Sequence, residues 1–260
     1  MNRIAKAFAG GKAFIPFVTA GDPSADKTVE YILEMEKAGA DLIELGIPFS
    51  DPTAEGPVIQ AANLRALRGG MTTDGAFGIV EKVRQSSQIP LVFLTYLNPV
   101  FHYGYEAFFA RCEAAGVDGI IIPDLPYEEK DEVARVAEPH GVHVISLVAP
   151  TSEQRIQAIA GAAGGFLYVV SSMGVTGVRS EIKTDLASIL AAVKQATHVP
   201  AAVGFGINTP EQAEAIARIA DGVIVGSAIV KLIESHGDHA AQPVADYVST
   251  MKAAVRRAET

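Results

Sequence analysis

The stretch Ala38-Gly39-Ala40-Asp41-Leu42-Ile43-Glu44-Leu45 joins a helical pattern to a short apolar strand, and this unit recurs along the chain. Two further copies are Ala115-Gly116-Val117-Asp118-Gly119-Ile120-Ile121-Ile122 and Ala220-Asp221-Gly222-Val223-Ile224-Val225. Each contains a glycine near the point where the helical pattern stops, and glycine is the usual C-terminal stop of a helix. The repeat therefore predicts that helices and buried strands alternate.

Eight segments have the composition of strands buried on both faces, because they are almost continuously apolar. They are residues 13–19, 41–45, 90–95, 118–122, 142–148, 166–170, 200–203 and 222–225. Helical patterns separate them, which predicts an α/β protein with a (β/α)8 TIM barrel. A doubly wound open sheet is the alternative.

The chain is predicted to be one barrel domain over residues 1–260, because no Pro/Ser-rich linker divides it. Ile4 and Phe8 indicate a short N-terminal helix before a Gly-Gly turn. Two connections, 47–90 after the second strand and 171–200 after the sixth, are longer than a simple unit needs. In a barrel such extended loops lie on the C-terminal face, where active sites are built.

The composition excludes several classes of protein. The chain has 260 residues, 49% of them hydrophobic, which is enough to form a large core. Its net charge of −9 argues against binding to nucleic acid or to an anionic membrane. No apolar run approaches the ~18 residues of a membrane span, and the N-terminus lacks the apolar core of a signal peptide. The single cysteine, Cys112, fits a reducing cytoplasm and is expected to be a packed thiol.

Two glutamates are the candidate catalytic residues. Glu44 lies inside an apolar strand near its C-terminal end, where burial of a carboxylate costs several kcal/mol or more. Its structural alternative is a pair with an arginine from a neighbouring strand. Glu55 follows in a turn-rich loop on the same face, and the two could divide the roles of acid and base.

Glycines after the last three strands predict a phosphate site. Gly204-Phe205-Gly206 and Gly226-Ser227 each stand ahead of a predicted helix N-terminus, and Gly174 with Gly177 could complete the site. Loops after strands seven and eight form the recurrent phosphate site of barrels. Thr209 and Gln212 have the spacing of a capping box. Each glycine could also belong to a plain turn.

No metal-ligand cluster of histidines or cysteines is visible, and no lysine lies where a strand ends. A metal aldolase would need the cluster, and a Schiff-base aldolase would need the lysine. Carboxylate acid–base chemistry on a phosphorylated substrate is what remains.

The motifs taken together resemble the tryptophan synthase alpha chain family along essentially the whole sequence. The residues that carry the resemblance are Pro16 to Pro23, Glu44 to Pro52, Gly56 to Gln60, Tyr168, Gly174 to Gly177, Gly204 to Gly206 and Gly226-Ser227. The resemblance implies a cytoplasmic lyase that cleaves indole-3-glycerol phosphate to indole and D-glyceraldehyde 3-phosphate. It further implies an alpha chain without a cofactor, in an α2β2 complex whose beta chain uses pyridoxal phosphate to make tryptophan.

The resemblance also assigns roles to single residues. Glu44 matches the catalytic glutamate, and Glu55 stands where the family usually has aspartate. Phe17 and Tyr168 match residues that line the substrate cavity, and Thr176 matches a threonine that helps close it. Gly177, Gly206 and Ser227 match phosphate contacts, next to Gly204, Phe205 and Gly226. Asp51-Pro52 falls in the loop that meets the beta chain.

Two alternatives stay open at this level. One is another phosphate-binding barrel isomerase or lyase, and the other is a subunit that mainly regulates a partner.

Overall fold

The strands close into a barrel. The computed structural model describes residues 2–170, 182–204 and 206–259. Its strands run parallel in chain order, and the last pairs with the first. They are β1 (Ala13–Thr19), β2 (Ile43–Gly46), β3 (Leu91–Leu94), β4 (Gly119–Ile121), β5 (His143–Val148), β6 (Leu167–Val170), β7 (Ala201–Gly204) and β8 (Gly222–Val225). The predicted (β/α)8 barrel is confirmed, with strand ends within about two residues of those expected, and the open-sheet alternative is wrong.

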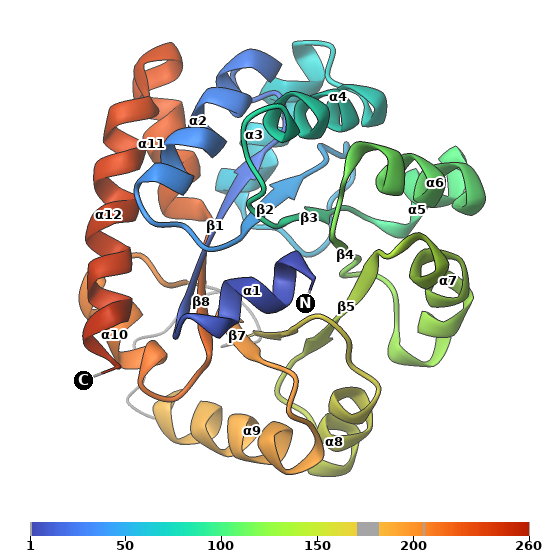
Figure 1. The fold of residues 1–260 in the computed structure, drawn as a ribbon, viewed down its shortest axis with the longest axis vertical. Coiled ribbons are helices and arrows are strands. Elements are labelled where there is room, and N and C mark those ends of the chain that lie inside the picture. The colour runs from blue at the N-terminus through green and yellow to red at the C-terminus, as the bar shows by residue number, and fades with distance from the viewer. Residues whose placement is uncertain (1, 171–181, 205, 260) are drawn as a thin grey trace.

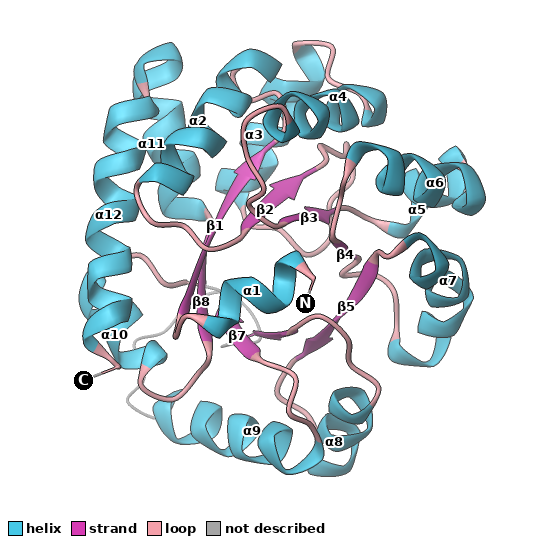
Figure 2. Cartoon of the chain, in the orientation of Figure 1, coloured by secondary structure: helices cyan, strands magenta, loops and turns pink. Residues whose placement is uncertain are grey.

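Helices surround this ring on all sides (Figure 1, Figure 2). They are α1 (Arg3–Ala9), α2 (Ala25–Lys37), α3 (Pro57–Arg68), α4 (Thr73–Arg84), α5 (Leu97–Tyr103), α6 (Tyr105–Ala115), α7 (Lys130–Ala137), α8 (Glu153–Gly161), α9 (Ile182–Ala196), α10 (Pro210–Ala217), α11 (Ser227–His236) and α12 (Ala241–Arg257). Three 3₁₀ turns are η1 (Tyr127–Glu129), η2 (Glu138–His140) and η3 (Gly237–His239). The long connection after β2 contains α3 and α4. The start of the connection after β6, residues 171–181, lies outside the described residues.

Helix α1 is the predicted N-terminal helix, and it closes one end of the barrel. Figure 1 shows it across the centre of the ring. Its Ile4 is buried among interior side chains that include Leu42 and Val92. Its Phe8 ring lies 5.8 Å from that of Phe166. Because apolar side chains fill this end, the opposite end, where the strands terminate, is left for a ligand.

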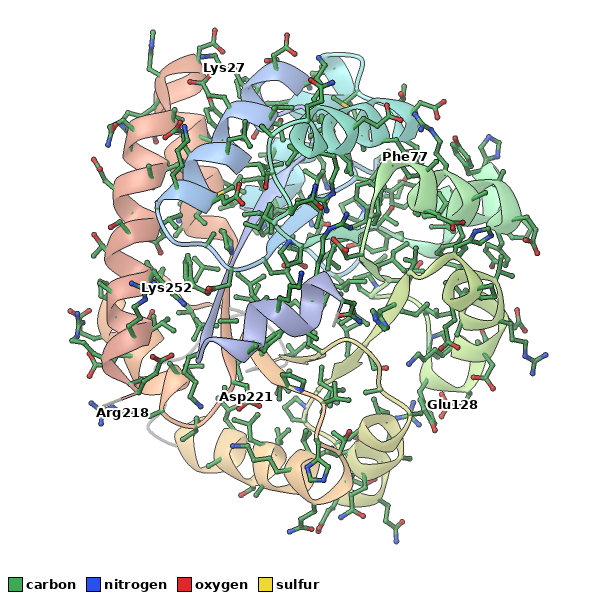
Figure 3. All side chains as sticks on the ribbon, viewed as in Figure 1. Lys27, Phe77, Glu128, Arg218, Asp221 and Lys252 are labelled. Atoms are coloured by element: carbon green, nitrogen blue, oxygen red, sulfur yellow. The ribbon has the colours of Figure 1, made fainter. Side chains whose placement is uncertain are left out.

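The aspartates of the repeated unit form hydrogen bonds between adjacent strands at the same closed end. Asp41, Asp118 and Asp221 each precede a strand, and each accepts a backbone N–H from the neighbouring strand. The three donors are Phe14 (2.7 Å), Leu91 (2.9 Å) and Ala201 (3.0 Å). Each carboxylate also pairs with a cation: Asp41 with Lys252, Asp118 with Arg84 and Arg3, and Asp221 with Lys12. Lys252 and Asp221 are labelled in Figure 3. The repeat therefore marks helix ends and also joins adjacent strands.

Strand alternation divides the core into two layers. Side chains such as Phe93 face outward and pack against helices. The ring centroid of Phe93 lies 5.4 Å from that of Phe77 on α4, which is labelled in Figure 3. The alternate side chains point into the barrel. Phe17 on β1 and Glu44 on β2 are register partners, so the inward alternation places an aromatic ring and a carboxyl group side by side.

Candidate active site

Glu44 lies on β2 inside the barrel, and only 2% of its surface is exposed. Within the described part of the chain its Oε1 atom has no hydrogen-bond partner. The pairing with an arginine that was the structural alternative is therefore not formed there. Burial, followed by the nearby Glu55 carboxyl, raises the pKa of Glu44 to about 8. At neutral pH this carboxyl group holds its proton and can donate it.

Glu55 lies in the loop between β2 and α3, and α3 holds it at two points. The Asn63 amide Nδ2 donates to the Glu55 Oε2 atom at 2.6 Å. The Gln60 amide Nε2 donates to the Glu55 main-chain oxygen at 2.7 Å. Burial raises the pKa of Glu55 to about 7, although the Asn63 hydrogen bond lowers it. Near neutral pH this side chain is therefore partly ionised.

The carboxyl groups of the two glutamates interact, and their pKa values differ. The Glu55 charge contributes to the raised pKa of Glu44, which shows that the carboxyls are close enough to interact. Groups coupled in this way titrate as a pair. One neutral and one ionised carboxyl at neutral pH can protonate one substrate atom and accept a hydrogen bond from another.

Tyr168 on β6 forms a wall beside Glu44. Burial and the Glu44 charge both raise the pKa of its phenol well above the ordinary value. The ring is accommodated by Gly204 on β7, where an added Cβ would lie 2.4 Å from the phenol oxygen. Gly204 was predicted as a substrate contact, and in the structure its missing side chain provides space for Tyr168.

Phe17 connects the barrel interior to two outer helices. It packs with Ala62 on α3 and Val230 on α11. A Cβ on Gly46 would lie 2.7 Å from its ring. The absence of a side chain at that position therefore allows the ring to lie over β2, next to Glu44.

Helix α11 offers an N-terminus suited to an anion. Its N-cap is Gly226, which has no side chain to bond the first amides, and its first turn from Ser227 has no acidic residue. Gly206 has a φ of +79° and nothing within 4 Å of where its Cβ would be. A helix N-terminus without a side-chain cap, its positive end and open space are what an anion requires.

Helix α10 does not offer the same feature, although the sequence favoured both helices. The predicted capping box is present, with Thr209 and Gln212 bonded to each other's backbone N–H groups. Pro210 has no N–H, the Gln212 N–H donates to the Thr209 hydroxyl, and hydrogen bonding to the backbone N–H of Glu211 itself lowers the pKa of the Glu211 carboxyl. The first turn of α10 therefore has its donors engaged.

Other predicted site residues take different places. Asp51 is exposed next to a half-buried Pro52, and Ser50 Oγ donates to its carboxylate. Gly174, Thr176, Gly177 and Phe205 lie outside the described residues. Among the residues that are described, no three His, Cys, Asp or Glu side chains converge as in a metal site. Nor does any described helix have the length and hydropathy to cross a bilayer.

Sequence reasoning missed two residues that shape this end of the barrel. One is Asn63, which is 2% exposed between Ala62 and Ala66 on the inner side of α3. The other is Tyr96, whose hydroxyl accepts the Ala54 N–H at 3.0 Å and so fixes the loop before Glu55. A polar side chain on the apolar face of a helix could have revealed Asn63, whereas no sequence signal links Tyr96 to a loop 42 residues away.

A closed parallel barrel with buried carboxyl groups and an anion-competent helix end defines the class of (β/α)8-barrel enzymes. The sequence matches the family described as "Tryptophan synthase alpha chain" over residues 5–258. The chain belongs to this family.

Similar proteins support the assignment along the full length. The alpha chain of Lacticaseibacillus casei is 51% identical over 255 residues, which is 98% of this chain and 96% of that protein. The alpha chain of Lactiplantibacillus plantarum is 49% identical and covers 100% of this chain and 99% of its own length. A crystal structure of the alpha chain from Legionella pneumophila superimposes with a TM-score of 0.90 at 38% identity, covering 99% of this chain and 98% of that one.

Proposed function

We propose that this chain cleaves indole-3-glycerol phosphate to indole and D-glyceraldehyde 3-phosphate by a retro-aldol reaction. Family membership supports the reaction. The observation that carries the mechanism is a buried glutamate, Glu44, beside a half-buried one, Glu55, whose carboxyl groups have pKa values of about 8 and about 7.

Glu44 is the general acid and then the base. The bond to be broken joins indole C3 to the hydroxyl-bearing carbon of the glycerol chain. Protonation of C3 by the neutral Glu44 carboxyl makes the indole an electron sink. The resulting carboxylate then takes the proton of the neighbouring hydroxyl, the C–C bond breaks, and its electron pair returns to the ring. One proton moves from oxygen to C3, and Glu44 ends as it began.

Glu55 stabilises the charge that develops on the ring. As a carboxylate it accepts a hydrogen bond from the indole N–H while C3 is protonated. Placement of a charged acceptor where positive charge appears lowers the barrier, because the interaction strengthens in the transition state.

The phosphate is bound far from the broken bond. The proposed contacts are the backbone N–H groups of Gly206 and Ser227 at the α11 N-terminus, with Gly226 between the strand and the helix. Phe17 and Tyr168 would form the walls around the indole. Binding energy from the phosphate can then hold the reacting end in position.

A beta chain is the proposed partner. A solved relative from Pyrococcus furiosus, 38% identical over 94% of this chain with a TM-score of 0.86, is described as a tryptophan synthase a2b2 complex. We place the contact at Asp51-Pro52, an accessible segment just before Glu55. In this proposal the chain needs no cofactor of its own, pyridoxal phosphate belongs to the beta chain, and the complex is cytoplasmic.

The test is indole release from purified indole-3-glycerol phosphate, first by this chain alone and then with a beta chain. Glu44→Gln should lower turnover by at least ~10²-fold, while Glu132→Gln, an exposed position on α7, should not change it. Turnover by the wild-type chain should be greatest between about pH 7 and about pH 8, where Glu55 is ionised and Glu44 is protonated. No indole with or without the beta chain would favour another barrel isomerase or lyase. Activity that is fully retained in Glu44→Gln would refute the mechanism.

A further inference from the structure

We infer that Asn63 is a positioning residue that orients the Glu55 carboxylate and keeps it ionised, an inference that rests on the proposed function of Glu55. Asn63 does not need to touch the substrate for this. Its amide is buried, and it donates to one oxygen of the carboxylate, Oε2, at 2.6 Å. The other oxygen, Oε1, is then the one turned to a substrate N–H.

This contact fixes a side chain that would otherwise be adjustable. Glu55 lies in a loop, and a glutamate has three side-chain torsions. Gln60 holds its main-chain oxygen, and the Tyr96 hydroxyl holds the preceding residue by its N–H. These two bonds set the backbone and leave the carboxylate free to rotate. Asn63 supplies the remaining restraint, at the end of the side chain where the chemistry takes place.

Helix α3, which carries Asn63, is itself held in place by the ion pairs of Arg65. Arg65, two residues further along α3, makes a two-point contact with the buried Asp22 carboxylate at 2.9 and 2.8 Å. Its third nitrogen donates to Glu234 on α11 at 2.8 Å. Phe17 packs between the same two helices, against Ala62 and Val230. Helix α11, which is proposed to bind phosphate, and helix α3, which orients Glu55, are therefore joined by an ion pair and by apolar packing.

Asn63 also affects the ionisation of the Glu55 carboxyl group. Burial favours the neutral form of Glu55, and the N–H of Asn63 favours the ionised form. With the amide removed, only the effect of burial would remain. The carboxyl would then hold a proton at neutral pH and lose the ability to stabilise a positive indole ring.

The experiment compares Asn63→Leu, which keeps the size but removes the donor, with Gln60→Leu, which removes the main-chain contact only. The Glu55 carboxyl would be titrated by ¹³C NMR on protein labelled at glutamate Cδ, with Glu55→Gln to identify its signal. In Asn63→Leu the pKa should rise by about one pH unit, and in Gln60→Leu it should stay where it is. This titration needs no substrate, so it tests Asn63 even if the wild-type chain releases no indole.

Indole release gives the second measurement. In Asn63→Leu, kcat relative to wild type at the same pH should be about tenfold lower at pH 7 and closer to wild type at pH 9, with KM for the substrate little changed. Asn63→Ala should behave in the same way and serves if the leucine variant fails to fold. An unchanged Glu55 pKa would overturn the inference. So would a loss of kcat that is equal at pH 7 and pH 9, because that would indicate a purely structural role.

Discussion

Replacement of Glu44 by Gln should stabilise the folded protein at alkaline pH while it removes catalysis. The reason is the proton balance of a buried acid. The pKa of Glu44 is about 8 in the folded protein against 4.5 for an ordinary glutamate. Between these values the unfolded chain has lost its proton and the folded protein has kept it, so a rise in pH favours unfolding.

The size of the effect follows from the same two values. Each pH unit between 4.5 and about 8 costs ~1.4 kcal/mol of folding free energy, which amounts to about 5 kcal/mol at pH 9 as an upper value. At pH 5 the cost is only about 0.8 kcal/mol, because this pH lies just half a unit above the pKa of 4.5 in the unfolded chain. The Gln side chain has no titration, so any cost of burying its amide is equal at all pH values.

The measurement is urea unfolding followed by far-UV circular dichroism at pH 5, 7 and 9. The free energy of unfolding of Glu44→Gln relative to wild type should increase from pH 5 to pH 9 by several kcal/mol. The exposed Glu132→Gln variant should show no such increase. If Glu44→Gln differs from wild type by the same amount at pH 5 and pH 9, Glu44 is ionised in the folded protein and cannot be the acid that protonates indole.

Substitutions at three further positions test the other parts of the site. Ser227→Asp puts a negative charge at the proposed anion site. The KM for the phosphorylated substrate should therefore rise strongly, while the free energy of unfolding changes little. Equal activity on substrates with and without phosphate would refute the proposed phosphate site. Gly204→Ala forces a methyl group to 2.4 Å from the Tyr168 hydroxyl oxygen, so kcat/KM should fall at least ~10-fold. The control is Gly161→Ala, which should leave kcat/KM unchanged because the added methyl group would meet nothing within 4 Å. Glu55→Asp should move the carboxylate away from the Asn63 amide and lower turnover on the order of 10²-fold. Glu55→Ala should lower turnover further. An aspartate variant as active as wild type would show that the loop adapts to either side-chain length.

The sequence predicted the barrel because its signals are local. Nearly continuous apolar runs such as 118–122 report burial on both faces, and glycines such as Gly116 report where helices end. Glu44 could be identified for the same reason, since a lone carboxylate inside an apolar strand is visible without any partner. The ends of strands moved by a residue or two because backbone pairing, rather than composition, decides where a strand stops.

What the sequence could not provide are contacts between distant segments. Nothing in the spacing shows that Asn63 reaches Glu55, because this depends on how α3 turns after the loop. The anion site shows the same limit. Gly206 and Gly226 both stand ahead of helices in the sequence, yet only the structure shows that a capping box engages donors at the start of α10, whereas the N-cap of α11 has no side chain to do so.

Buried charge is treated in opposite ways at the two ends of this barrel. At the end closed by α1, Asp118 bonds a backbone N–H and two arginines. At the other end, within the described residues, the Glu44 Oε1 atom and the hydroxyls of Thr19 and Thr95 are buried without a partner. Thr19 ends β1, Thr95 directly follows β3, and Glu44 lies two residues before the end of β2. Each unpaired polar atom costs stability, and a carboxyl that found a cation there would lose the high pKa that lets it act as an acid. The paired aspartates stabilise the strands at one end, and so the barrel can tolerate at the other an acid that it leaves unpaired.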